Sequence, residues 1–182
     1  MNMQLAGRVG MCFLSGIVVG LIHDGWGVLN DLYEPLVYLM SGLVFSAGVL
    51  SPYVRRDKWV ALRALGLVLA STLSYYVAVT LVSEGVGADY HDWISFTIAS
   101  VAGAALVIGP VVFLAPVRPS TKLFALVLVS ALIGGPVTWL TLPFTEDHLP
   151  LVALGYMGWH ALIGLALYFG TEGTPRLSGT LR

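Results

Sequence analysis

Long apolar runs alternate with short polar segments along the 182 residues of this chain. A bilayer core about 30 Å thick takes roughly 20 helical residues to cross, and a spanning helix satisfies its own backbone groups within lipid. The pattern therefore predicts an all-α polytopic membrane protein, a compact bundle of six transmembrane helices in a single domain, residues 1–182. The predicted spans cover residues 5–22, 32–50, 59–83, 93–117, 121–142 and 149–170.

Charged residues divide between the two sides of this six-span pattern. Eight of the ten acidic residues lie toward one side, and all nine basic residues lie on the other. Because basic residues close to membrane spans stay in the cytoplasm, both termini are predicted to be cytoplasmic. Short connections and this clear bias are typical of a bacterial inner membrane. The basic residues are Arg8, Arg55, Arg56, Lys58, Arg63, Arg118, Lys122, Arg176 and Arg182.

Composition excludes several classes of protein. With 57% hydrophobic and 10% charged residues, a water-soluble domain of this length could not bury its apolar surface. Cys12 is the only cysteine, so an intrachain disulfide is excluded. The sequence contains no phosphate-binding loop, dinucleotide fingerprint or Cys-x-x-Cys motif. Basic residues number two or three in each loop and serve topology, so no nucleic-acid partner is expected.

His160 is the ionisable residue that the pattern places deepest, eleven positions after Leu149 in a span without charged side chains. An ionisable group near the bilayer midplane indicates a functional site. Helical spacing puts His160 on one face with Tyr156 and Gly164, which favours solute binding or proton relay by His160 and Tyr156. The alternative is a neutral histidine that a hydroxyl of a neighbouring span satisfies. The hydroxyls at suitable depth belong to Ser41, Ser71, Thr72 and Ser74.

The function that these features favour is transport, or transport-linked binding, of a small polar or cationic solute that enters from the outer face. Such a protein needs no cofactor. Pro110 and Pro136 should kink their helices and open space between them. Glu34 can alternatively be a solvated cap at a helix start. Residues expected to attract cations at the mouth are Asp24, Glu34 and Asp92, and those expected to contact solute deeper are His160, Tyr156, Ser71, Ser74 and Tyr75.

Three histidines beside carboxylates lie at the outer connections: His23, His91 and His148. Imidazole and carboxylate together suit a divalent transition metal, so a metal-dependent enzyme acting on a lipid or another hydrophobic substrate is an alternative function. No HxxxH or HExxH spacing supports it, and solvated loop residues explain the same pattern. An intramembrane serine protease would pair Ser15 or Ser41 with His160, but the sequence Gly-x-Ser-Gly is missing. A non-enzymatic role is favoured.

Small residues recur at four-residue spacing within the spans, for example Gly16 and Gly20 in the first and Ala99 and Gly103 in the fourth. Such stripes allow close approach of helices in lipid. They predict a tight bundle, or a face toward a second copy or a partner membrane subunit. A second alternative function is therefore that of a non-catalytic lipid-binding, sensory or assembly subunit.

Overall fold

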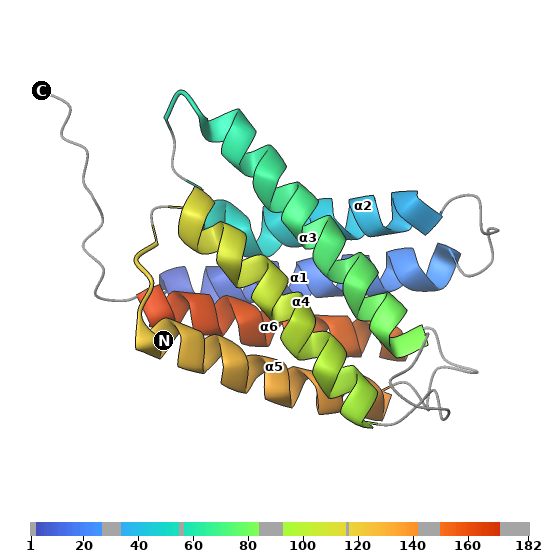
Figure 1. The fold of residues 1–182 in the computed structure, drawn as a ribbon. Coiled ribbons are helices and arrows are strands. Elements are labelled where there is room, and N and C mark those ends of the chain that lie inside the picture. The colour runs from blue at the N-terminus through green and yellow to red at the C-terminus, as the bar shows by residue number, and fades with distance from the viewer. Residues whose placement is uncertain are drawn as a thin grey trace, which may run out of the picture.

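The computed structural model describes residues 3–26, 34–54, 57–83, 93–115, 117–141 and 150–171. These residues form an all-α fold, as the sequence predicts, and no strand occurs among them (Figure 1). A π-helical turn η2 (Ser46–Leu50) and a 3-10 turn η3 (Ser51–Tyr53) extend the second helix. The α-helices are α1 (Met3–Trp26), α2 (Glu34–Phe45), α3 (Val60–Ser83), α4 (Trp93–Leu114), α5 (Thr121–Thr141) and α6 (Pro150–Thr171).

The outer surface of the bundle is apolar. Leu14, Leu62 and Phe113 are 59%, 61% and 88% exposed, which is acceptable only where lipid replaces water. Among the residues that the structure describes, five segments are long and apolar enough to cross a membrane: Leu5–His23, Pro35–Tyr53, Val60–Val82, Trp93–Leu114 and Thr121–Thr141. The sixth helix, α6, is 22 residues long and packs against α1 and α5. The chain is therefore a multi-pass membrane protein whose surface contacts the bilayer.

The helices form a closed ring. Each helix packs against its neighbours in sequence, and α6 packs against α1 to close the circle. Neighbouring helices run antiparallel (Figure 1). The helices α1, α3 and α5 all terminate at one end of the bundle, which we call the His23 end. We call the opposite end the Arg8 end. The charge pattern of the sequence predicts that the His23 end faces outward.

Glycines lie where helices of the ring approach most closely. A Cβ atom at Gly16 of α1 would lie 2.6 Å from the backbone nitrogen of Met157 in α6. A Cβ atom at Gly135 of α5 would lie 2.5 Å from the Cα of Thr97 in α4. Both contacts are with backbone, which cannot give way as a side chain would. Without a hydrophobic drive between helices in lipid, this close approach supplies much of the packing energy.

The π-helical turn η2 replaces the last turns of the predicted second span. Gly48 of η2 lies against α1, where an added Cβ atom would come 2.5 Å from the Cβ of Ser15. The backbone N–H of Ser51 donates to the carbonyl of Ser46, which completes the wide turn. Single π-turns inside helices often occur next to functional groups. This one places Phe45 and Gly48 beside the centre of the bundle.

Tightly packed apolar side chains fill the interior of the ring at the Arg8 end. Leu67, Val111, Leu123 and Leu167 come from four different helices and are almost completely buried in one cluster. At the surface of this end, the Arg8 guanidinium lies 5.1 Å from the ring centroid of Tyr168. The apolar cluster leaves the His23 half as the place for a cavity.

We expect Gly16→Ala to lower the free energy of unfolding by about 1–3 kcal/mol, because the new methyl group overlaps the Met157 backbone and separates α1 from α6. The matched control is Gly10→Ala on the same helix, where a Cβ atom meets nothing within 4 Å. Circular dichroism during a denaturant titration in detergent measures both variants. Equal stability of the two variants would contradict the close α1–α6 packing.

Candidate functional site

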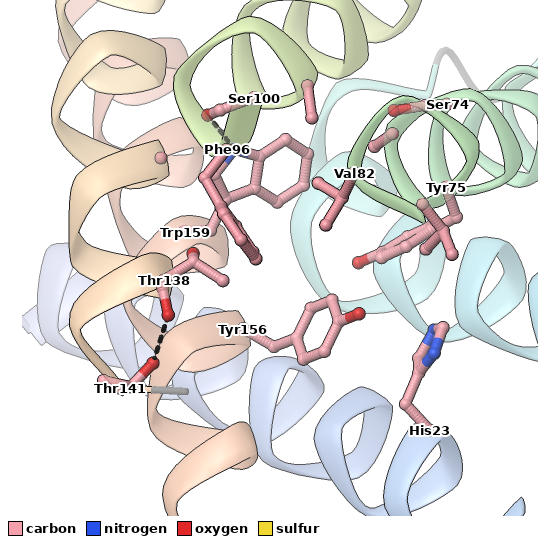
Figure 2. A pocket seen from close by; sticks show the side chains of 14 residues that line it. His23, Ser74, Tyr75, Val82, Phe96, Ser100, Thr138, Thr141, Tyr156 and Trp159 are labelled. Atoms are coloured by element: carbon pink, nitrogen blue, oxygen red, sulfur yellow. Dashed lines mark hydrogen bonds between the residues drawn. The ribbon is translucent and has the colours of Figure 1, made fainter. Parts of the chain in front are cut away.

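A cavity of about 300 Å³ lies inside the ring in its His23 half (Figure 2). Its wall is formed by α1, α3, α4, α5 and α6. It extends from Val82 and Thr141, in the last turns of α3 and α5, inward to Ser74 and Trp159. This volume is at the lower end of the range for small-molecule sites.

Aromatic rings dominate the wall of the cavity. They belong to His23, Tyr75, Phe96, Tyr156 and Trp159, and the described wall contains no Asp, Glu, Lys or Arg. The His23 ring stacks on the Tyr156 ring with centroids 5.0 Å apart. The Tyr75 and Tyr156 rings lie 6.0 Å apart, centroid to centroid. The wall is therefore largely apolar with a few polar groups, the usual character of a site for an organic ligand.

Most hydroxyls on the wall already have partners within the protein. Ser74 Oγ donates to the carbonyl of Gly103 at 2.9 Å and so ties α3 to α4. Thr138 and Thr141 donate to carbonyls of their own helix, those of Gly134 and Thr138, at 2.9 and 2.7 Å. These bonds remove polar hydrogens from the cavity and increase its apolar character.

Trp159 is held in place from two sides. Its Nε1–H donates to Ser100 Oγ at 2.8 Å across the ring, from α6 to α4 (Figure 2). Gly134 provides the space for the indole, because a Cβ atom there would lie 2.7 Å from Trp159 Cδ1. A tryptophan inside a membrane bundle requires such a partner for its N–H. Trp159 thus forms a fixed part of the wall.

His160 lies behind the cavity wall and is completely buried. Ser15 Oγ lies 2.8 Å from its Nδ1, and the Tyr75 hydroxyl bonds its Nε2. Because Ser15 Oγ donates to the Cys12 carbonyl at 2.9 Å, we assign the tautomer in which Nδ1–H donates to Ser15 and Nε2 accepts from Tyr75. His160 therefore links α6 to both α1 and α3.

No carboxylate among the described residues contacts His160. Phe45 packs on the imidazole with ring centroids 4.8 Å apart, and Trp159 lies at 5.8 Å. A charged imidazole at this depth would be costly without a carboxylate, so the ring is neutral. Sequence reasoning expected a hydroxyl of Ser41, Ser71, Thr72 or Ser74 as its partner, but the structure places Ser15 and Tyr75 there instead.

All four of these hydroxyls bond elsewhere, and those of Ser71 and Thr72 bond carbonyls of their own helix. Ser71 donates to the Leu67 carbonyl at 2.8 Å and lies 3.0 Å from Ser46 Oγ, at the contact between α3 and η2. Thr72 donates to the Val68 carbonyl at 2.9 Å. Ser71 and the cavity-lining Ser74 thus belong to different contacts, although they lie three residues apart. The structure brings Ser74, Tyr75 and Tyr156 to the cavity and His160 directly behind it.

His23 lies inside the bundle, because α1 continues beyond the predicted end of its span at residue 22 as far as Trp26. Its Nε2 lies 3.1 Å from the oxygen of buried Ser41. The other two histidines of the suggested metal site, His91 and His148, lie outside the described residues. Within the described ranges, no three His, Cys, Asp or Glu side chains are grouped to hold a metal ion.

The acidic residues predicted at the mouth cannot be placed in the same way. Asp92 and the side chains of Asp24 and Glu34 fall outside the part of the chain whose placement the structure describes. Their suggested attraction of cations stays a prediction.

Sequence reasoning missed Phe96 and Trp159, and it considered Ser15 beside His160 only as a protease nucleophile, not as the partner of a neutral histidine. Trp159 stands next to His160 in the middle of an apolar span, and a large indole at that depth was a signal for an internal partner. The signal for Ser15 was weaker. It consisted only of the position of Ser15 in a Ser-Gly pair near the middle of its span. Phe96 gave none, because one more phenylalanine in an apolar helix usually contacts lipid.

The Ser15–His160 contact has the residue types of a nucleophile and its base, but it does not form an active site. Ser15 is 5% exposed, and neither residue lines the cavity. A nucleophile has to reach a substrate carbonyl. The contact therefore holds α1 against α6.

Comparisons with protein-family models, with curated proteins and with solved structures found no match to this chain.

We expect Tyr75→Phe to lower the free energy of unfolding by about 1–3 kcal/mol, because it leaves Nε2 of buried His160 without a partner. Tyr76→Phe is the matched control, since Tyr76 is the next residue and is 51% exposed. In a His160→Leu background, the effect of Tyr75→Phe should fall, since no nitrogen is then left unpaired. Denaturant titrations of the wild type, Tyr75→Phe, His160→Leu and the double variant provide this double-mutant cycle. An undiminished effect in the leucine background would show that the two side chains are not coupled.

Proposed function

We propose that this protein binds a small, largely apolar organic solute within the membrane, as part of transport or a transport-linked uptake step. The single observation that carries the proposal is the aromatic cavity of about 300 Å³ inside the helix ring. A tight bundle without a ligand would fill such a space with side chains, as it does at the Arg8 end.

The wall chemistry supports a different class of solute from the small polar or cationic one that the sequence suggested. A strongly polar or charged solute would lose its hydration in the cavity, and the described wall offers no opposite charge in return. Rings from α3, α4 and α6 instead match a flat or branched hydrocarbon body. The prediction that acidic residues attract a cation concerns Asp24, Glu34 and Asp92 and draws no support from the cavity itself.

The position of the cavity favours access from one side. The wall reaches the last turns of α3 and α5 at the His23 end, which the charge pattern predicts to face outward. Toward the Arg8 end, the cluster around Leu67, Val111 and Leu167 closes the interior. The proposed sequence of events therefore begins with solute capture at the outer side, and release inward requires this cluster to separate.

We expect Ala78→Trp, which fills the cavity from α3, to lower the affinity for an aromatic probe by at least about ten-fold, because the indole and the probe cannot share one site of this size. Ala61→Trp on the same helix is the control, since Ala61 is exposed on the surface. Equilibrium dialysis of 1-naphthol and 1-methylnaphthalene against protein in nanodiscs measures binding, with protein-free nanodiscs subtracting the partition into lipid. Equal binding of both probes to the two variants and to the wild type would refute the proposed function.

A further inference from the structure

The hydroxyl of Tyr156 differs from the other hydroxyls on the cavity wall. It makes no hydrogen bond to any residue in the described ranges, whereas Ser74, Tyr75, Ser100, Thr138 and Thr141 all do. The ring of Tyr156 is fixed by stacking on His23. An internal polar group without a protein partner takes one from water or from a ligand. Tyr156 therefore offers an O–H donor inside the cavity.

Tyr75 offers the complementary group. In the assigned tautomer of His160, the Tyr75 O–H donates to Nε2, so the Tyr75 oxygen lone pairs remain available as acceptors. The direction of this bond follows from the chain of donors, because Ser15 donates to the Cys12 carbonyl and Nδ1–H donates to Ser15. The buried His160 thus determines what Tyr75 presents to the cavity.

The two tyrosines reach into the cavity from α3 and α6, with ring centroids 6.0 Å apart (Figure 2). The acceptor on Tyr75 and the donor on Tyr156 together match a hydroxyl group, which donates once and accepts on the same atom. An ether or a ketone can accept from Tyr156 but cannot donate to Tyr75.

We propose that the solute is a neutral alcohol or phenol. Its hydroxyl donates to the Tyr75 oxygen and accepts from the Tyr156 O–H, while its hydrocarbon body lies against Val82, Phe96 and Trp159. This assignment rests on the proposed function, since it names the solute class of the same cavity. The pair Tyr75 and Tyr156 then acts as the specificity element, and the rings supply most of the contact area.

Three probes of similar shape test the assignment in nanodiscs: 1-naphthol, 1-methylnaphthalene and 1-methoxynaphthalene. We expect 1-naphthol to bind about three- to ten-fold more tightly than 1-methoxynaphthalene, the difference that one neutral hydrogen bond makes. In Tyr156→Phe, the preference for 1-naphthol over 1-methylnaphthalene should fall by about three- to ten-fold. Tyr76→Phe is the control and should keep the wild-type preference. Because each preference is a ratio within one variant, a smaller folded fraction does not change it.

The outcomes separate this inference from the proposed function. If the probes bind at the cavity but 1-naphthol and 1-methoxynaphthalene bind equally, or if Tyr156→Phe keeps the wild-type preference, the hydroxyl assignment is overturned and the cavity remains a binding site. If no probe binds, or if Ala78→Trp binds all three as well as the wild type does, the proposed function fails and the assignment fails with it.

Discussion

A neutral histidine that needs two hydrogen-bond partners inside a membrane is the constraint on which the centre of this protein depends. Both nitrogens of His160 need a hydrogen-bond partner within the protein, because the ring is completely buried and no carboxylate among the described residues contacts it. Ser15 and Tyr75 meet this need from two helices, and the close contact of α1 with α6 at Gly16 brings one of them within reach. The position of Tyr75, and with it one wall of the cavity, follows from this contact.

The two halves of the ring are lined by different residue types, and only one half is filled. In the Arg8 half, leucines and valines from four helices meet in a filled core. In the His23 half, rings replace them, and rings held by Ser100, Gly134 and His23 do not collapse into the space between them. Rigid aromatic side chains with fixed partners can therefore maintain a cavity that flexible aliphatic side chains would fill.

The sequence predicted the fold well and the site only in part. Hydropathy predicts spanning helices because the length of an apolar run can be read directly along the sequence. It also identified His160, because the depth of a residue in the membrane follows from its position within such a run. The hydrogen-bond partners of His160 depend on the order of helices around the ring and on the rotation of each helix about its axis. Neither can be read from the depth of a residue in the membrane. Ser15 and Ser71 have comparable depth, yet only Ser15 faces His160. His23 was taken for a loop residue because its polarity ended the apolar run, although no helix-breaking residue precedes Gly25 and α1 continues to Trp26.

Closure of the ring by α6 also has a consequence for biosynthesis. Helix α6 leaves the ribosome after the other five, so α1 enters the bilayer long before the helix against which Gly16 and Ser15 pack. Until then the face of α1 that carries Gly16 and Ser15 contacts lipid or the insertion machinery. The last helix carries both the histidine and two rings of the wall, Tyr156 and Trp159. Arrival of this one helix therefore closes the circle, brings His160 and Trp159 to the hydroxyls of Ser15, Tyr75 and Ser100, and completes the cavity wall late in assembly.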